Sequence, residues 1–322
     1  MADAFDIIIF GGAGDLALGK LIPALYRAFL EDGFSNRSRI IACCHQQVQA
    51  DNFIELVNQA LRKQLSADEC SEQSWQVFKQ ALLALRIDVA DTQHDSNKDP
   101  GHGWPALASL LAEQPARVRV FYLAIPPTIY AVCCENLSAM DLITERARIV
   151  VEKPIGYDAK SAAVINAKIA QYFDEKAIYR IDHYLGKETV QNLMVLRFAN
   201  QIFELAWNAQ NIDNIQITAS ESLGVGSRKE YYDKFGALKD MVQNHLLQLL
   251  CLVAMEPPIS LDANNVRDEK LKVLKALRLF ENKNIKSDVV KGQYTRGSIN
   301  NEKVKVNWKE KDDEDSVYLI EK

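Results

Sequence analysis

Residues 5–17 read FDIIIFGGAGDLA, an apolar run that passes directly into glycines. A short apolar run is typical of a buried parallel strand, and the pattern from about Asp15 to Leu30 predicts a helix directly after it. Glycines in such a turn let the backbone approach a pyrophosphate at the helix N-terminus. The spacing is G-x-x-G-D-L-A rather than G-x-G-x-x-G. The motif therefore indicates a dinucleotide site or, alternatively, only a tight turn in another α/β protein; its strand–turn–helix context favours the first. The candidate cofactor-binding residues here are Gly11, Gly12, Gly14, Asp15 and Leu16.

Segments that favour strands and helices alternate over the first 185 residues. Strand patterns occupy 5–10, 39–44, 118–124, 147–151 and 178–181. Helical patterns occupy about 15–30, much of 51–85, 128–141 and 158–173. Parallel strands need crossover connections, so this alternation predicts a sheet covered by helices. We expect an α/β fold with a Rossmann-like, doubly wound parallel sheet, forming a dinucleotide-binding domain over residues 1–185.

The pattern changes after residue 185. A helix is expected at 187–199, a strand at 213–222 and a long apolar helix at 236–255. These elements predict an incomplete α+β substrate domain over residues 186–297. From Glu302 to Lys322, twelve of twenty-one residues are charged, too many to bury the apolar surface that ordering requires. We therefore expect residues 298–322 to form a disordered tail.

Composition narrows the class of protein. The net charge of −5 argues against a nucleic-acid partner, because phosphate backbones favour a basic face. No apolar stretch reaches the roughly 18 residues of a membrane span. The six cysteines fit neither a zinc spacing nor a disulfide framework. We expect a cytoplasmic protein with reduced thiols, no metal, and no nucleic-acid or membrane partner.

A strand end carries Glu152-Lys153-Pro154. Open parallel sheets bind ligands beyond the carboxyl ends of their strands, where a lysine can reach substrate or cofactor. The proline makes the turn rigid, in either the trans or the cis form. The alternative is a solvated charge pair, and the motif alone does not decide between the two.

The segment RIDHYLGKE, residues 180–188, packs several polar groups between a strand end and a helix start. A histidine, a tyrosine hydroxyl and a lysine there can converge on a phosphate that also faces the helix N-terminus. A single histidine is more often structural, but the cluster favours phosphate binding.

The segment DMVQNHLLQ, residues 240–248, places His245 in an otherwise apolar helix. Buried polar side chains need partners, and imidazole suits a general base near neutral pH. Asp182 could orient it, as a carboxylate does in other histidine-dependent sites. A core histidine bonded to the backbone is the alternative.

With these motifs in order, the chain resembles the bacterial type of the glucose-6-phosphate dehydrogenase family. The resemblance covers about residues 5–297 and rests on GGAGDLALGKLIPALY, VVEKPIGYD, YRIDHYLGKETVQNLMVLRFAN, EYYDKFGALKDMVQNHLLQLLC and VRDEKLKVLKALR. It implies oxidation of glucose 6-phosphate at C1 to 6-phosphogluconolactone, with hydride transfer to NADP or NAD, as the first step of the pentose phosphate pathway.

The resemblance also implies roles for single residues. His245 matches the general base, and Asp182 matches its paired carboxylate. The sugar-phosphate clamp matches His183, Tyr184 and Lys187. Lys153 matches a strand-end lysine at the substrate and the cofactor. The carboxylates that bond sugar hydroxyls match Glu221 and Asp233.

Two departures leave alternatives open. His45 stands where relatives that prefer NADP carry an arginine, and no acidic residue there favours NAD, so either cofactor is expected. Relatives are homo-oligomers that continue well beyond this chain, and the part not matched holds most of the interface sheet. We therefore expect weak or lost turnover; the alternatives to an active enzyme are a silent remnant that still binds dinucleotide and another two-domain sugar oxidoreductase. RIDHYLGKE disfavours the last, because an unphosphorylated sugar needs no phosphate clamp.

Overall fold

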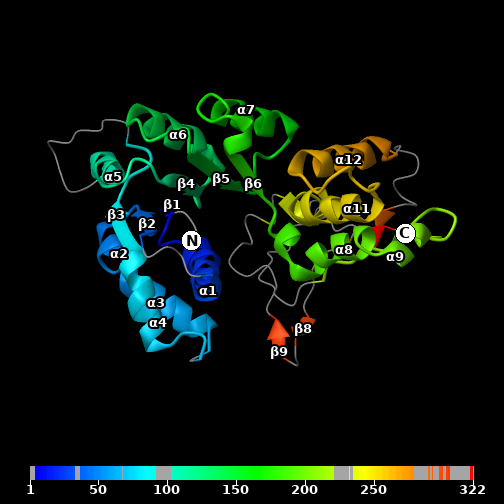
Figure 1. The fold of residues 1–322 in the computed structure, drawn as a ribbon, viewed down its shortest axis with the longest axis horizontal. Coiled ribbons are helices and arrows are strands. Elements are labelled where there is room, and N and C mark those ends of the chain that lie inside the picture. Colours follow the sequence, from blue (N-terminus) through cyan, green and yellow to red (C-terminus); the bar gives the residue numbers. More distant parts are fainter. Residues whose placement is uncertain are drawn as a thin grey trace. The chain divides into compact units, whose positions relative to one another are not determined.

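The computed structural model describes residues 4–32, 37–66, 68–91, 103–220, 232, 235–278, 289–290, 292, 297–299, 302–304 and 320–321. The chain divides into two compact units, Met1–Ile181 and Asp182–Lys322, each coloured along the sequence in Figure 1. Within the described ranges, no helix is long and apolar enough to cross a membrane. All six cysteines are buried and free.

The first unit is built on six parallel strands. They are β1 (Phe5–Phe10), β2 (Arg39–Cys44), β3 (Leu82–Arg86), β4 (Val118–Leu123), β5 (Ala147–Glu152) and β6 (Ile178–Ile181). Their order in the sheet is β3-β2-β1-β4-β5-β6, and every neighbouring pair is parallel. The chain moves outward from β1 in one direction and then returns to β4 on its other side. The predicted doubly wound sheet is confirmed, with its switch point between β1 and β4.

Helices cover both faces of this sheet. Ile8 and Phe10 of β1 pack toward α5 (Gly103–Ala112), α6 (Tyr130–Ala139) and α7 (Ala159–Ile169). Ile7 and Ile9 pack toward α1 (Ile22–Asp32), α3 (Phe53–Gln64) and α4 (Glu72–Phe78). Successive strand residues point to opposite faces, so an uninterrupted apolar run is what a strand buried on both sides requires. Shorter helical segments are η1 (Ala17–Leu21), α2 (Gln47–Asp51), η2 (Lys79–Ala81), η3 (Pro127–Ile129) and η4 (Glu175–Ala177).

One expectation for this unit was wrong in detail. Helical patterns were expected over much of 51–85, but the end of that range belongs to β3 (LLALR, residues 82–86), which pairs with β2. A short apolar run has no period long enough to distinguish a buried strand from a buried helix, and pairing decides it. The helix expected from about Asp15 to Leu30 is confirmed, and it contains the π-helical segment η1 near its start.

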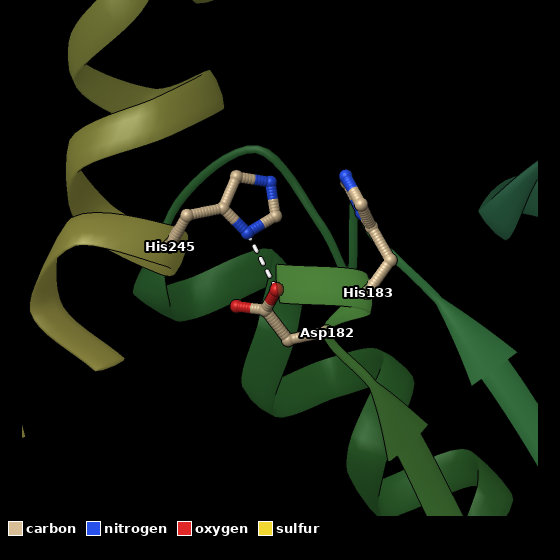
Figure 2. A group of neighbouring side chains, drawn as sticks. All are labelled: Asp182, His183 and His245. Carbon is tan, nitrogen blue, oxygen red and sulfur yellow. Dashed lines mark hydrogen bonds and ion pairs between the residues drawn. The ribbon is translucent and has the colours of Figure 1, made fainter. Parts of the chain in front are cut away.

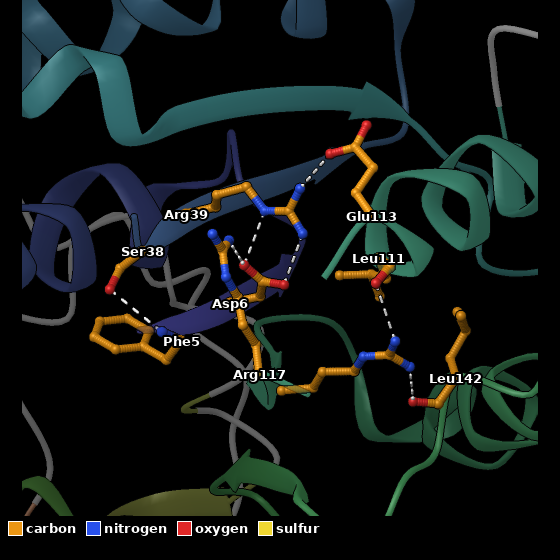
Figure 3. A network of polar contacts seen from close by, with 9 residues as sticks. Phe5, Asp6, Ser38, Arg39, Leu111, Glu113, Arg117 and Leu142 are labelled. Carbon is orange, nitrogen blue, oxygen red and sulfur yellow. Dashed lines mark hydrogen bonds and ion pairs between the residues drawn. The ribbon is translucent and has the colours of Figure 1, made fainter. Parts of the chain in front are cut away.

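A buried carboxylate fixes the amino edge of the central strands (Figure 3). Asp6 is fully buried at the start of β1. Arg39, at the start of β2, donates to both of its oxygens at 2.9 and 2.8 Å. Arg117, just before β4, donates to Asp6 Oδ1 at 2.9 Å. One carboxylate thus ties the starts of three adjacent strands together, at the edge opposite the glycine turn. Glu113 joins the network from outside, because Arg39 also donates to its carboxylate at 2.8 Å.

The second unit is helical in its described part. It contains η5 (His183–Gly186), α8 (Glu188–Phe198), α9 (Gln201–Ala206), η7 (Leu238–Leu246), α11 (Leu247–Ala254) and α12 (Ala263–Ala276). The helices expected at 187–199 and 236–255 are confirmed. Their shared core is small, centred on Val190, Leu252 and Met255. The buried Arg197 reinforces it by donating to the carbonyls of Leu252 and Met255 at 2.6 and 2.8 Å.

The strand expected at 213–222 is not formed in its described part, because residues 213–220 have no regular secondary structure. A strand needs a neighbour to satisfy its backbone groups, and no described segment pairs with these residues. Parts of the tail also differ from expectation. Short strands form at β8 (Gly297–Ile299) and β9 (Glu302–Val304), which pair, and at β10 (Ile320–Glu321), which pairs with β7 (Val289–Val290). The rest of 298–322 lies outside the described residues.

We predict that Asp6→Asn destabilises the protein by about 3–5 kcal/mol, because two arginines then lose the charge that compensates them in a buried site. The urea midpoint of unfolding, followed by circular dichroism, measures this. Glu113→Gln is the matched control, since that carboxylate is 62% exposed and its ion pair should contribute only about 0–1 kcal/mol. Equal midpoints for the two variants would contradict a central role for Asp6.

Candidate functional site

The glycine turn lies at the carboxyl edge of the sheet, beside the switch point. Gly11 has φ +82°, and a Cβ on it would lie 2.4 Å from the carbonyl oxygen of Ala124. A Cβ on Gly12 would lie 2.5 Å from that of Ala42. Both amides donate to the carbonyl of Cys43, at 3.0 and 3.2 Å. Only glycine fits at these two positions, so the turn stays close to the ends of β2 and β4 and opens toward the start of the helix.

The other predicted cofactor residues share this edge. Gly14 and Asp15 are exposed, and Leu16 is half-buried, where the helix begins. His45 follows β2 and is 75% exposed, with its Nδ1 3.9 Å from a carboxylate oxygen of Asp88. The turn, the backbone approach and the open helix start fit the pyrophosphate of a dinucleotide.

Lys153 follows β5 at the same edge, and the Lys153–Pro154 peptide is cis, one of the two forms that the sequence allowed. The preceding Glu152 is held by two tyrosines. The Tyr122 hydroxyl donates to its carboxylate, and the Tyr130 hydroxyl donates to its carbonyl at 3.3 Å. Burial raises the pKa of both phenols, that of Tyr130 to about 12, so both are protonated donors at neutral pH. Sequence reasoning missed these tyrosines, although both lie beside the strand end that it singled out.

Sequence reasoning also missed Arg86. No strand was expected here, whereas Arg86 ends β3 in register with Cys44, one residue before His45. Arg86 is exposed. Arg86 and His45 therefore lie at the carboxyl ends of two neighbouring strands, with the carboxylate of Asp88 close to His45.

In the second unit, a carboxylate and an imidazole meet (Figure 2). Asp182 Oδ1 lies 2.5 Å from His245 Nδ1. Asp182 is also the N-cap of η5, and the same oxygen accepts the amide of Tyr184 at 3.0 Å. His245 is completely buried, and its Nε2 has no hydrogen-bond partner among the described residues. A carboxylate at Nδ1 holds the proton on that nitrogen and leaves Nε2 as the free acceptor.

The charge state of Asp182 follows from these contacts. Burial by itself raises the pKa of this carboxyl group, but the hydrogen bond with His245, the Tyr184 amide and the nearby imidazoles outweigh it. The net effect lowers the pKa of Asp182 below its ordinary value. The group is therefore a carboxylate at neutral pH, which is the form that can orient an imidazole.

Two further aromatic rings pack against His245. The Tyr184 ring stacks on the His245 ring with centroids 4.1 Å apart and planes at 12°. The exposed His183 ring lies edge-on to His245 at 4.7 Å, and the ammonium of Lys187 lies 3.5 Å above the Tyr184 centroid. The RIDHYLGKE segment thus places the His183 ring and the Lys187 ammonium near the buried histidine.

The helix that carries His245 is π-helical over Leu238–Leu246. Asp240 and His245 are both buried although they lie five residues apart. In an α-helix, residues three or four apart share a face, whereas the i→i+5 bonding of a π-helix places residues five apart together. An ordinary helix was expected here, so the sequence indicated the residue but not the winding that buries it.

Lys270, on α12, is a further polar group near the pair. Its ammonium donates to Gln248 Oε1 at 3.0 Å, and Gln248 lies three residues after His245. Burial lowers the pKa of Lys270, and the negative charge of Asp182 acts in the opposite direction. The helical period of the VRDEKLK segment does not predict the contact between Lys270 and Gln248.

The structure brings five of the predicted residues together in one unit: Asp182, His183, Tyr184, Lys187 and His245. Lys153, His45 and the glycine turn belong to the other unit. Glu221 and Asp233 lie outside the described residues. Chemically, the cluster offers a buried acceptor nitrogen near the exposed Lys187 ammonium, which suits removal of a proton from an anionic substrate.

Two family models match the chain. "Glucose-6-phosphate dehydrogenase, NAD binding domain" matches residues 8–192, and "Glucose-6-phosphate dehydrogenase, C-terminal domain" matches residues 194–318. Glucose-6-phosphate 1-dehydrogenases of Rhizobium meliloti and Gluconobacter oxydans are 47% and 45% identical, each over 94% of this chain and 60% of their own length. The chain thus spans about 60% of these curated relatives.

Solved structures give the same result. A glucose-6-phosphate dehydrogenase in complex with its substrate glucose 6-phosphate superposes with a TM-score of 0.79 at 34% identity, over 94% of this chain and 62% of that one. The glucose-6-phosphate 1-dehydrogenase of Mycobacterium avium gives a TM-score of 0.75 at 35% identity, over 91% of this chain and 61% of that one.

We predict that Asp182→Asn lowers stability at neutral pH and that the loss disappears in acid. The pKa of Asp182 is lower in the folded chain than in the unfolded chain, so the unfolded chain takes up the proton first. The stabilisation is complete above the ordinary carboxyl pKa of about 4 and vanishes as pH falls through the lower folded value. Urea midpoints of wild type and variant at pH 7 and at the lowest pH where both fold would measure this; a difference that grows in acid would refute it.

Proposed function

Since the chain belongs to the glucose-6-phosphate dehydrogenase family, we propose that it oxidises glucose 6-phosphate at C1 and passes a hydride to a nicotinamide dinucleotide. The product is 6-phosphogluconolactone. The observation that carries the proposal is the Asp182–His245 pair, with a buried Nε2 beside the groups of a phosphate clamp.

His245 removes the proton in this mechanism. Its Nε2 accepts the proton of the C1 hydroxyl while the dinucleotide supplies the chemistry of hydride acceptance. Loss of that proton lets the C1–O bond become a double bond as the hydride leaves C1. Asp182 keeps the Nδ1 proton in place and stabilises the imidazolium that forms, so the histidine acts without a change of tautomer.

Three residues of η5 and its C-cap bind the substrate phosphate in this proposal. Lys187 supplies an ammonium group, and His183 and the Tyr184 hydroxyl supply further donors. Charge-assisted bonds to an anion are the strong class, so a few local cations suffice on a chain of net charge −5. Lys153 serves the substrate and cofactor from its strand end, and Glu221 and Asp233 stay predictions for the sugar hydroxyls.

An active enzyme is favoured over a silent dinucleotide-binding remnant. Binding of a dinucleotide does not require the arrangement found in the second unit. There, Asp182 is hydrogen-bonded to His245, the Tyr184 ring stacks on His245, and the Lys187 ammonium lies above the Tyr184 ring. The test is direct: the purified protein is mixed with glucose 6-phosphate and NADP or NAD, and the nicotinamide absorbance is followed. We expect reduction with the phosphorylated sugar and little with glucose. No reduction with either cofactor would reject the proposal.

For the cofactor, we propose that both dinucleotides are accepted, with NADP moderately preferred. Arg86 offers positive charge and His45 offers a ring N–H donor to a 2′-phosphate at neighbouring strand ends. Asp88, 3.9 Å from His45, weakens that attraction. All three groups are exposed, so each is screened by solvent and has a small effect.

We predict that His245→Ala lowers kcat by roughly 10²–10⁴-fold, the usual contribution of a positioned base, while the Kd of NADP changes little. Steady-state kinetics and fluorescence titration of the dinucleotide measure the two quantities. A variant that retains near-normal kcat would remove His245 from this role.

We predict that Lys187→Ala raises KM for glucose 6-phosphate by roughly 10–100-fold, because one charge-assisted bond contributes about 1.5–3 kcal/mol. Turnover of glucose should be almost unchanged, since it has no phosphate. Lys168→Ala, which removes an exposed lysine of the other unit, is the matched control. Equal losses for both sugars would mean that Lys187 shapes the site without binding phosphate.

We predict that Asp88→Asn raises the preference for NADP over NAD by about 2–5-fold and that Arg86→Ala lowers it by a similar factor, the range expected for exposed charges. The ratio of kcat/KM for the two cofactors measures this at low salt. Glu113→Gln, at the opposite edge of the sheet, controls for the change in net charge. A ratio that none of the variants moves would place the 2′-phosphate elsewhere.

A further inference from the structure

The cluster of Asp182, His183 and His245 could also bind a metal ion, a property that proton transfer does not use. Asp182, His183 and His245 each offer one ligand atom, and these atoms lie within 4.8 Å of one another (Figure 2). His245 Nε2 is buried and has no hydrogen-bond partner among the described residues. A buried polar nitrogen without a partner is uncommon, because leaving it unpaired costs about 1–3 kcal/mol.

The bond between Asp182 and His245 is the arrangement that metal-bound histidines usually have. Such a histidine gives its other ring N–H to a carboxylate, which fixes the tautomer and raises the basicity of the ligating nitrogen. Here the carboxylate is already 2.5 Å from Nδ1, and Nε2 is left as the ligating atom.

The second imidazole can complete the site. The rings of His183 and His245 lie 4.7 Å apart at 74°. Zinc binds imidazole nitrogen at about 2.0–2.1 Å, so one metal can bind nitrogens of two neighbouring rings at once. His183 is exposed, and its exposure leaves further coordination positions to water.

The donor set also selects the metal. Imidazole nitrogen suits Zn²⁺ and its neighbours in the first transition row, whereas Mg²⁺ and Ca²⁺ prefer sites made of oxygen. The ammonium of Lys187, above the Tyr184 ring that stacks on His245, opposes a second positive charge. A cation held by nitrogen bonds tolerates this better than one held by charge alone.

We propose that His245 Nε2 and His183 form a reversible binding site for Zn²⁺, with Asp182 holding the Nδ1 side of His245, and that the bound metal inhibits the enzyme by occupying the nitrogen that accepts the substrate proton. Metal binding stands without the proposed function, and only the inhibition rests on it. No bond is made or broken in the polypeptide, because the neutral imidazoles donate lone pairs.

The test uses the full chain after removal of metals with a chelator. Co²⁺ serves as the visible probe, and Zn²⁺ is then titrated in competition. We expect one equivalent of Co²⁺ with the absorption of a nitrogen–oxygen site, displaced by one equivalent of Zn²⁺ and unaffected by Mg²⁺. His183→Asn should weaken binding at least 10-fold, and Asp182→Asn by about 10–100-fold, the usual effect of losing the carboxylate partner. His45→Asn, an exposed histidine of the other unit, should leave binding unchanged.

Equal Co²⁺ affinity in wild type and His183→Asn, or a thiolate charge-transfer band, would overturn the proposal by placing the metal elsewhere. A readout on the wild type avoids any folding defect of the variants. Zn²⁺ should protect His183, but not His45, from carbethoxylation by diethyl pyrocarbonate, as read by peptide mass spectrometry. Equal modification of His183 with and without Zn²⁺ would also reject the site. If turnover of glucose 6-phosphate is absent, the proposed function fails while these binding measurements still decide the metal site.

Discussion

The hydrogen bond between Asp182 and His245 joins two segments that lie 63 residues apart in the chain. Asp182 also caps η5, so the same oxygen that orients the imidazole starts the turn that carries His183 and Tyr184. The stacked Tyr184 ring and the cation above it then follow from that turn. Loss of this one carboxylate would remove the bond to the histidine, the cap of η5 and the support of the stacked rings together, so the geometry of the site depends on it.

The proposed substrate is an anion, yet the chain that would bind it has a negative net charge. Long-range attraction cannot supply the affinity, since exposed charges are screened within about 8–10 Å at ordinary salt. The cations must therefore lie at the phosphate itself, and a helix start beside a strand end is where backbone amides add to them. The glycine turn at the edge of the sheet also relies on backbone amides at a helix start, and its glycines leave room for a phosphate to approach them.

The sequence predicted those parts of the molecule that depend on local pattern. The apolar runs at 5–10 and 39–44 are buried on both faces, so their strands and the glycine turn between sheet and helix could be located in advance. It failed where long-range pairing decides: LLALR becomes β3 because β2 lies beside it, and residues 213–220 find no partner among the described segments. Within the site, the motifs identified Asp182 and His245. The π-helical winding and the contact of Lys270 with Gln248 depend on packing between helices, which no period in the sequence records.

A base that works from inside a protein must keep one nitrogen unsatisfied until substrate arrives. His245 is completely buried, and the Asp182 carboxylate at Nδ1 holds the ring in one tautomer, so that Nε2 stays available as an acceptor. The same two features make a good ligand for a borderline metal, because both proton and metal compete for one lone pair. An oriented, desolvated imidazole next to a second imidazole cannot be selective for the proton by geometry alone. Selectivity has to come from charge, and Lys187 on the Tyr184 ring is the group placed to supply it, since it attracts the substrate phosphate and repels a free cation.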